Sequence, residues 1–233
     1  MRSRDPLTVK DLFNTVSPTY DILNDLFSFG LHRNWKRHLL SLLKPSLEEK
    51  WVDLCCGTGD LSIALAHYLG QKGSVVGVDF SKKQLEVARK RALKRSIHSV
   101  SWLQADVLVN ALPSNSFDGA VMAYGLRNLS SPEAGLKEIY RLLKPGSRAG
   151  VLDFNHAKKG TVNAFFQKCY LRKLVVPIAS LLGLREHYSY LEKSLKTFPS
   201  GFAQQSMARS IGFEKVSYKL IAGGQMGVLL LKT

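Results

Sequence analysis

A glycine turn, followed about twenty residues later by an acid, constrains the fold of this chain more than any other feature. Residues 51–56 form an apolar run long enough for a buried parallel strand, and the run leads into Gly57 and Gly59. Glycines at a strand-to-helix turn let the backbone approach a ligand closely, where a side chain would collide. A second apolar run, residues 74–80, holds Asp79 near its end, a carboxylate suited to the two hydroxyls of a ribose. This order predicts a nucleoside-cofactor site on a doubly wound sheet.

The residues around the turn favour a cationic cofactor over a dinucleotide. A dinucleotide fingerprint needs a third small residue to seat a pyrophosphate on the helix N-terminus, and Ser62 meets that need only loosely. Asp53 and Asp60 flank the turn, and carboxylates suit a positively charged ligand better than a pyrophosphate. The spacing Asp-x-x-x-Gly-x-Gly that ends at Gly59 resembles motif I of class I S-adenosylmethionine (SAM) methyltransferases. We therefore expect S-adenosyl-L-methionine as methyl donor, with a tight turn that binds no ligand as the alternative.

The chain is strongly basic and shows no sign of export or of a metal centre. Its net charge of +15 indicates an anionic partner (nucleic acid, an acidic membrane surface or a phosphorylated ligand), with a solvated basic face as the alternative. Residues 1–10 hold no apolar signal region, and no apolar stretch reaches the length of about 18 residues that a spanning helix needs. Cys55, Cys56 and Cys169 lack metal-ligand spacing. We expect a cytoplasmic protein without a metal, at most peripheral on a membrane.

Strand and helix patterns alternate from residue 51 onward, which is typical of a parallel sheet with helices on both faces. Two further strand patterns near the end of the chain surround Ala222-Gly223-Gly224 and predict a hairpin. The expected fold is therefore an α/β, Rossmann-like class I SAM methyltransferase with a seven-stranded, mostly parallel sheet. The expected strands are 51–56, 74–80, 100–106, 117–125, 147–154, 213–221 and 226–233, and the helices that follow the cap are 60–70, 81–95, 132–143 and 200–211.

Two helical additions accompany this core in what we predict is a single domain, residues 1–233. Helical apolar patterns precede the first strand, and the last of them, residues 31–43, places Trp35 and Leu39 on one side. A mixed apolar and basic segment interrupts the alternation after the fifth strand and indicates a pair of helices. The expected parts are a helical cap (1–50), a SAM-binding core (51–156), a helical insert (157–199) and a C-terminal helix with a β-hairpin (200–233).

Ligands of doubly wound sheets lie over the carboxyl ends of the strands, so residues at those ends are candidate SAM contacts. Asp106 follows the third strand, where its carboxylate would accept a hydrogen bond from the exocyclic amine of adenine. The Val107 peptide would complete the contact with the adenine edge. A helix cap or turn residue is the alternative for Asp106. The sulfonium and methyl group would lie after the fourth strand. The predicted cofactor-binding residues are Asp53, Gly57, Thr58, Gly59, Asp79, Asp106, Val107, Ala123 and Tyr124.

The segment after the fourth strand argues against methylation of nucleic acids. Amino-group methyltransferases of nucleic acids carry Asn/Asp-Pro-Pro-aromatic there, whereas this chain has Gly125-Leu126-Arg127-Asn128. No Pro-Cys nucleophile for pyrimidine carbon methylation is present either. We expect no nucleic-acid partner, and a basic SAM-binding module that acts on RNA is the alternative from another functional class.

Several motifs spread over most of the chain indicate a family. They are Phe13-Asn14-x-Val16-x-Pro18-x-Tyr20-Asp21-x-Leu23-Asn24-Asp25, Ser28-Phe29-Gly30-x-His32-Arg33-x-Trp35-Lys36, Asp53-Leu54-Cys55-Cys56-Gly57-Thr58-Gly59-Asp60-Leu61, Phe117-Asp118, Gly125-Leu126-Arg127-Asn128, Arg141-x-Leu143-Lys144-Pro145-Gly146 and Leu152-Asp153-Phe154. With these motifs the chain resembles the ubiquinone/menaquinone biosynthesis C-methyltransferases. The Cys-Cys pair, Asp153-Phe154-Asn155 and Ala222-Gly223-Gly224-x-Met226-Gly227 are most similar to the branch that acts on phytyl-naphthoquinones. Ser147 departs from the family, which commonly has a second glycine there.

The resemblance implies carbon methylation of a prenylated naphthoquinol, and the branch implies conversion of demethylphylloquinol to phylloquinol in vitamin K1 synthesis. Demethylmenaquinol or a ubiquinone-pathway benzoquinol is the alternative substrate. Loss of a phenolic proton would make the ortho carbon nucleophilic; Arg127 would stabilise the phenolate charge and Asn128 would orient a water or a ring hydroxyl. A surface ion pair is the alternative role for Arg127. Further candidates for ring contact, on the cap, are Tyr20, Asp21 and His32.

The insert has a function under this interpretation, because a substrate with a long isoprenoid tail resides in a membrane. Lys168, Arg172 and Lys173 alternate with apolar residues, a pattern that suits an interfacial helix on anionic lipid. We therefore expect peripheral contact with a membrane surface. A core helix pair packed on the cap is the alternative.

Overall fold

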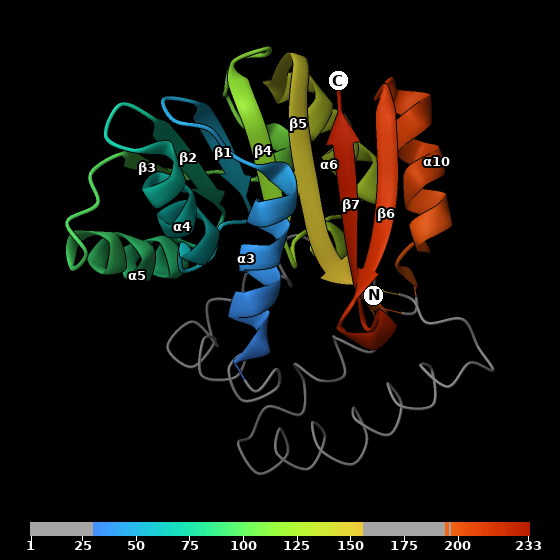
Figure 1. Cartoon of the computed structure of the whole chain (residues 1–233), viewed down its shortest axis with the longest axis horizontal. Coiled ribbons are helices and arrows are strands. Elements are labelled where there is room, and N and C mark those ends of the chain that lie inside the picture. The colour runs from blue at the N-terminus through green and yellow to red at the C-terminus, as the bar shows by residue number, and fades with distance from the viewer. Residues whose placement is uncertain (1–29, 156–193, 196) are drawn as a thin grey trace.

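The computed structural model describes residues 30–155, 194–195 and 197–233, which form a sheet flanked by helices (Figure 1). The sheet has seven strands in the order β3-β2-β1-β4-β5-β7-β6. Strands β1 to β5 pair in parallel, and β7 runs antiparallel to β5 and β6. The sheet confirms the predicted seven-stranded, mostly parallel α/β fold.

The elements follow the predicted order of strands and helices. The strands are β1 (Lys50–Leu54), β2 (Ser74–Asp79), β3 (Val100–Gln104), β4 (Phe117–Ala123), β5 (Leu143–Phe154), β6 (Lys215–Ile221) and β7 (Met226–Lys232). The helices are α3 (Leu31–Leu43), α4 (Asp60–Leu69), α5 (Lys82–Leu93), α6 (Pro132–Leu142) and α10 (Gly201–Ile211), and short 3-10 turns are η1 (Val107–Val109), η2 (Leu126–Asn128) and η4 (Ala222–Gly224).

Several strand ends differ from the prediction by one or two residues and the start of β5 by four, and two of these differences have clear local reasons. Strand β3 ends at Gln104, because Asp106 already caps η1. Strand β5 begins at Leu143, four residues earlier than predicted, because Leu143 pairs with Phe117 before a register shift. The Lys-Pro-Gly turn is therefore an irregularity inside β5 rather than a linker in front of it.

Serine side chains begin three of the helices. Ser81, Ser131 and Ser200 each accept a hydrogen bond from the backbone N–H three residues further on, before α5, α6 and α10 respectively. Such caps satisfy one of the unpaired N–H groups of a first helical turn. Each cap fixes the residue at which the chain turns from a connection into a helix.

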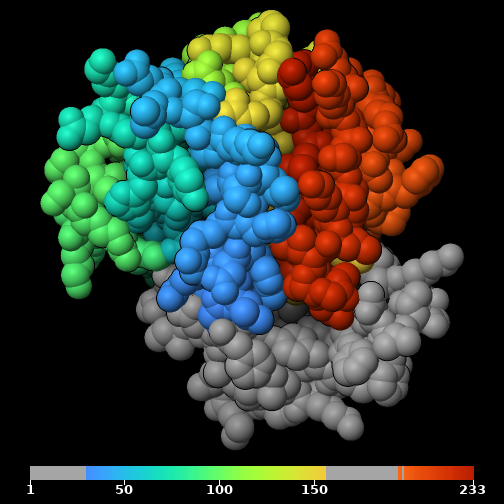
Figure 2. Space-filling model, in the orientation of Figure 1, coloured from blue at the N-terminus to red at the C-terminus, as the bar shows by residue number. Residues whose placement is uncertain are grey.

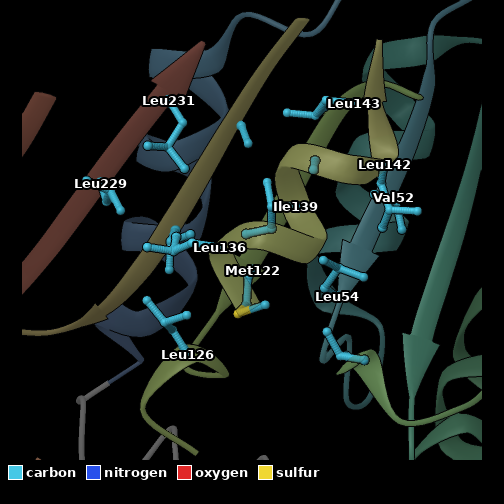
Figure 3. Packing of buried hydrophobic residues seen from close by; sticks show 14 of the residues in the cluster. Val52, Leu54, Met122, Leu126, Leu136, Ile139, Leu142, Leu143, Leu229 and Leu231 are labelled. Carbon is cyan, nitrogen blue, oxygen red and sulfur yellow. The ribbon is translucent and has the colours of Figure 1, made fainter. Parts of the chain in front are cut away.

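Alternating residues of the strands build a core on each face of the sheet. Met122 and Val151 pack with α6 and α10, whereas their neighbours Val121 and Leu152 pack with α3 and α4. This follows from the two-residue period of a strand. Figure 3 shows residues of the first core meeting from β1, β4, α6 and β7. Figure 2 shows α3 on the opposite face, between α4 and the C-terminal strands.

The strand order reverses direction beside β1, and this places the site. Strand β1 pairs with β2 on one side and with β4 on the other, so the connections from β1 and β4 leave in opposite directions. In open α/β sheets a crevice opens at such a point, outside the carboxyl ends of the strands. The predicted glycine turn follows β1 directly and therefore borders this crevice.

The two predicted helical additions fall only partly within the described residues. The last cap segment, residues 31–43, is confirmed as α3, whereas residues 1–29 and most of the insert lie outside the described part. The described helices are all too short or too polar to cross a membrane.

We predict that Gly59→Ala destabilises the ligand-free protein by about 2–4 kcal/mol. Gly59 has a φ of +82°, and an added Cβ would lie 2.6 Å from Trp102 and 3.0 Å from the Cβ of Ala88. The left-handed conformation alone costs about 1–2 kcal/mol for alanine, and overpacking adds about 1–3 kcal/mol. Chemical denaturation of the variant and of the wild type measures the loss of unfolding free energy.

Gly146→Ala is the matched control for this prediction. Gly146 has a similar φ of +75°, but nothing lies within 4 Å of its added Cβ. It should show the backbone penalty alone. Equal losses of stability in the two variants would contradict the packing role of Gly59.

Candidate functional site

A cavity opens at the carboxyl ends of β1 to β4, where the strand order predicted it. Its lining combines acidic groups, apolar side chains and the backbone of the first glycine turn. The predicted site residues among the lining are Gly57, Asp79, Asp106, Val107, Ala123, Tyr124 and Asn128. The other lining residues, which were not predicted as site residues, are Cys55, Phe80, Gln84, Leu108, Gly125, Leu129 and Ser130.

The carboxylate of Asp79 joins the glycine turn to the start of α5. Its Oδ2 accepts the Gly57 N–H at 2.8 Å, and its Oδ1 accepts the Ser81 N–H at 2.9 Å. Burial raises the pKa of Asp79 to about 6, although these backbone hydrogen bonds oppose the shift. Each carboxylate oxygen has a second lone pair. Asp79 could therefore hold the turn and accept hydrogen bonds from ligand hydroxyls at once.

Asp106 lines the same cavity and has a role in the local fold. Its Oδ1 accepts the Leu108 N–H at 2.8 Å and caps η1. The cap considered in the sequence analysis is thus present, and the same residue also lines the cavity with Val107. The two roles are compatible, because a carboxylate offers more lone pairs than the cap uses.

Asp53, Thr58 and Gly59 are near the cavity but outside its lining. Asp53 is buried, and its Oδ2 accepts a hydrogen bond from Ser62 Oγ at 2.6 Å, which ties β1 to α4. Burial raises the pKa of Asp53 to about 7. Thr58 Oγ1 accepts from Arg91 Nη1 at 2.7 Å. These contacts support the shape of the turn, and direct contact of the three residues with a cofactor stays a prediction.

Asp60, the first residue of α4, lies next to basic side chains from two other helices. Lys36 Nζ of α3 lies 2.9 Å from its carboxylate, Arg91 of α5 pairs with the other oxygen, and His32 Nε2 lies 3.9 Å away. Burial alone would raise the pKa of Asp60, but Lys36 and Arg91 hold it well below its usual range. The structure thus places His32 beside Asp60 and outside the cavity lining.

The segment after β4 packs tightly against the turn after β1. Tyr124 has a φ of +61°, an uncommon backbone conformation for a bulky residue. Gly125 follows it, and an added Cβ there would lie 2.7 Å from Cys55 Cβ. A glycine is required because the two turns approach this closely. The lysine of the Asp60 cluster, Lys36, lies over the Tyr124 ring at 5.8 Å.

Arg127 forms a buried ion pair with Asp153, rather than the surface pair considered from the sequence. The Arg127 Nε lies 3.2 Å from Asp153 Oδ1, and its backbone N–H donates to Oδ2 at 3.1 Å. Its Nη1 donates to Asn128 Oδ1 at 2.9 Å and to Ser194 Oγ at 3.2 Å. The guanidinium also lies 5.3 Å from the Phe154 ring. Burial raises the pKa of Asp153, and the charge of Arg127 opposes that shift.

Asn128 connects this ion pair to the cavity. It lines the cavity itself, and its Nδ2 donates to the Tyr124 carbonyl at 2.9 Å. Arg127 is therefore one side chain away from the lining. Tyr20 and Asp21, which we predicted for ring contact, lie outside the described residues, as do Lys168, Arg172 and Lys173 of the insert.

This donor set fits a cationic nucleoside cofactor. The lining offers carboxylates for hydroxyl and amino groups, a backbone turn without side chains, and apolar surface for a base. The buried carboxylate of Asp79 lies at the turn and is ionised above its pKa of about 6, and its negative potential favours a sulfonium.

Comparisons with known proteins agree with this geometry. The sequence model of the ubiE/COQ5 methyltransferase family matches residues 1–230. The chain is 43% identical over 224 residues to the 2-phytyl-1,4-naphthoquinone methyltransferase of Nostoc punctiforme, covering 96% of this chain and 97% of that protein. It is 40% identical to the chloroplastic 2-phytyl-1,4-beta-naphthoquinone methyltransferase of Arabidopsis thaliana, covering 94% and 85% of the two chains.

Solved structures show the same fold at low sequence identity. A SAM-dependent methyltransferase from Thermotoga maritima has a TM-score of 0.64 at 21% identity, covering 95% of this chain and 98% of that one. A phosphoethanolamine N-methyltransferase from Haemonchus contortus, in complex with SAM, has a TM-score of 0.65 at 14% identity, covering 86% and 52%. These likenesses identify the fold as that of SAM-dependent methyltransferases.

We predict that Asp79→Asn weakens binding of S-adenosylhomocysteine at least tenfold. A hydrogen bond to a charged acceptor contributes about 1.5–3 kcal/mol, and asparagine offers a single oxygen for contacts that now use two. The wild-type affinity should also fall as the pH is lowered through about 6, where protonation removes acceptor capacity from Asp79. Isothermal titration calorimetry between pH 5.5 and 8 measures both effects.

Asp118→Asn is the control for the change of charge. Asp118 lies at the start of β4, at the opposite end of the sheet from the cavity, and pairs with Lys144. It should leave the affinity and its pH dependence unchanged. An Asp79→Asn variant with wild-type affinity would contradict the assignment of Asp79 to the cofactor.

Proposed function

This chain belongs to the ubiE/COQ5 methyltransferase family, and on that premise we propose that it methylates a ring carbon of reduced 2-phytyl-1,4-naphthoquinone, in phylloquinone synthesis. It is a SAM-dependent methyltransferase by family and by fold. The observation that supports this substrate is the sequence identity of 40–43%, over nearly the whole chain, to proteins named for phytyl-naphthoquinone methylation. Two such relatives are cyanobacterial and plant proteins, and both are covered along most of their length.

The reduced ring is the form that this chemistry needs. A quinol that loses a phenolic proton places electron density on the ortho carbon, whereas the oxidised quinone has no such nucleophilic carbon. When bound, SAM supplies an electrophilic methyl group, so a carbon–carbon bond forms as the carbon–sulfur bond breaks and S-adenosylhomocysteine leaves. The ring then gives up the proton of the methylated carbon. The protein has to position the ring, exclude water and help to move protons.

The cofactor half of the site is held by the carboxyl ends of β1 to β4. We assign Asp79 to the ribose hydroxyls, because its carboxylate is fixed by two backbone hydrogen bonds and still has lone pairs. We assign Asp106 and Val107 to the adenine edge and the region of Ala123 and Tyr124 to the sulfonium. With this assignment, the methyl group would lie near the turn after β4.

We assign Arg127, held by its ion pair with Asp153, to the phenolate. Asp153 accepts a hydrogen bond from the Arg127 backbone N–H and forms an ion pair with the Arg127 Nε. The Arg127 Nη1 donates to Asn128 and Ser194. Within the described residues, these contacts occupy Nε and Nη1 of Arg127. We therefore assign Nη2 of Arg127 to the developing phenolate. A guanidinium held before the reaction stabilises charge without reorganising during it. Asn128 lines the cavity and would orient a ring hydroxyl or a water.

Contact with a membrane surface is part of the same proposal. A phytyl tail is apolar, so its ring must be collected from a lipid phase. The chain carries a net charge of +15, which favours an anionic surface. The basic and apolar insert segment that we expect to make this contact lies outside the described residues.

The central test is transfer of a labelled methyl group from SAM under anaerobic conditions in mild detergent. Demethylphylloquinone and demethylmenaquinone would be supplied in reduced and in oxidised form. We expect product from the reduced rings alone, with faster turnover of the phytylated substrate. Product from oxidised rings would contradict the quinol mechanism. If SAM binds but no ring is methylated, the proposed substrate is wrong.

We predict that Arg127→Met lowers kcat about 100-fold and changes S-adenosylhomocysteine affinity less than twofold. Removal of one preorganised donor to an oxyanion typically has an effect of about that size on kcat. The single variant leaves Asp153 buried without its cation, which destabilises proteins by about 3–5 kcal/mol. The double variant Arg127→Met/Asp153→Asn removes both charges and should recover stability while kcat stays low.

Arg141→Met is the matched control, because Arg141 pairs with Glu138 within α6 and does not line the cavity. Its kcat should remain near the wild-type value. A double variant that regains both stability and turnover would show that Arg127 acts only in the fold.

A further inference from the structure

One buried side chain of the cavity has polar atoms that the fold does not satisfy. Gln84 lies in the first turn of α5, is 2% exposed and lines the cavity beside Asp79 and Phe80. Within the described part of the chain, neither Nε2 nor Oε1 of its side-chain amide has a hydrogen-bond partner. Its backbone N–H is satisfied separately by Ser81 Oγ at 3.3 Å. A buried amide without partners is unfavourable, and native proteins satisfy most such groups.

A second glutamine in the same protein shows the ordinary outcome. Gln204 lies in the first turns of α10 and is equally buried, at 2% exposure. Its Nε2 donates to the Pro199 carbonyl at 2.9 Å. Burial near a helix start therefore does not by itself leave a glutamine unsatisfied here. What distinguishes Gln84 is its position on the cavity.

The position of Gln84 restricts what its amide can meet. Its Oε1 lies 3.8 Å from the point where a Cβ on Gly57 would stand, next to the hydrogen bond that joins Gly57 to Asp79. The amide thus lies at the junction of the glycine turn and β2, on the side of the cavity that we assign to the ribose and the base. An amide offers both a donor and an acceptor. A ribose hydroxyl offers both as well, and adenine offers acceptors at its ring nitrogens and a donor at its exocyclic amine, whereas a sulfonium offers neither.

We infer that the side-chain amide of Gln84 hydrogen-bonds the nucleoside half of SAM and of S-adenosylhomocysteine. The inference deepens the proposed function and rests on its SAM site. Loading of the cofactor then satisfies an amide that the ligand-free fold leaves unpaired. Gln84 is accordingly a binding residue that favours the loaded state, alongside the carboxylate of Asp79.

The experiment compares Gln84→Met with wild type, using S-adenosylhomocysteine and 5′-methylthioadenosine as separate probes in calorimetric titrations. Methionine keeps the length of the side chain and removes its hydrogen bonds. We expect the affinity for both probes to fall about tenfold, which corresponds to about 1.4 kcal/mol. The two losses should be equal, because 5′-methylthioadenosine retains the nucleoside and lacks the amino-acid group. Loss confined to S-adenosylhomocysteine, or no loss at all, would overturn the inference.

Thermal unfolding without ligand separates this role from packing. Gln84→Met should melt no lower than the wild type, because an unsatisfied amide is replaced by an apolar group. Gln204→Met, the matched control, should melt lower and bind both probes normally, because its amide is already paired. A Gln84→Met protein with a lowered melting temperature would indicate a packing role and overturn the inference.

Two further arms keep the outcomes distinct. Gln84→Glu, a second variant of similar size, should also bind both probes more weakly than the wild type, because its carboxylate cannot donate a hydrogen bond and lies beside Asp79. Wild-type affinity in this variant would overturn the inference. A wild type that binds neither probe would contradict the proposed cofactor itself, which is a different failure from equal binding by wild type and variant.

Discussion

The hydrogen bonds of one carboxylate hold together the parts on which the site depends. Asp79 accepts the Gly57 N–H from the turn after β1 and the Ser81 N–H at the start of α5. The turn, the second strand and the next helix are thereby fixed to one another at the edge where the cavity opens. The same burial that makes these bonds strong raises the pKa of the acid. Structural support and ligand binding therefore use different lone pairs of a single group.

A second layer of charge pairs surrounds this centre and positions the elements beside it. Asp60 holds α3 through Lys36 and α5 through Arg91, so the cap helix is tied to the helix that begins at the glycine turn. Asp153, at the end of β5, holds Arg127 after β4. Asp153 is buried and Asp60 is partly buried, so desolvation offsets much of the Coulomb energy of these pairs and leaves their geometry as the main contribution. These pairs fix the positions of Lys36, Arg91 and Arg127.

Close approach of backbones explains why glycines recur where the strands end. Gly59 accommodates Trp102 and Ala88, and Gly125 accommodates Cys55. The contact between Gly125 and Cys55 brings the turns after β1 and β4 together, next to Tyr124 with its left-handed backbone. The apolar cores on the two sheet faces supply the rigid support against which these turns are held.

The sequence by itself determined the strands, the helices and the glycine turn, because strand period, helix period and the need for glycine are local properties. It also placed Asp79 and Asp106 at strand ends, where fold rules locate a ligand. Only the tertiary structure decided that Arg127 meets Asp153, 26 residues away, and that Asp60 meets Lys36 and Arg91, 24 and 31 residues away. The unsatisfied amide of Gln84 was equally hidden, because a lack of partners depends on every neighbour that folding brings near. Side-chain pairing and burial depend on residues that are distant in the sequence, so no local sequence pattern predicts them.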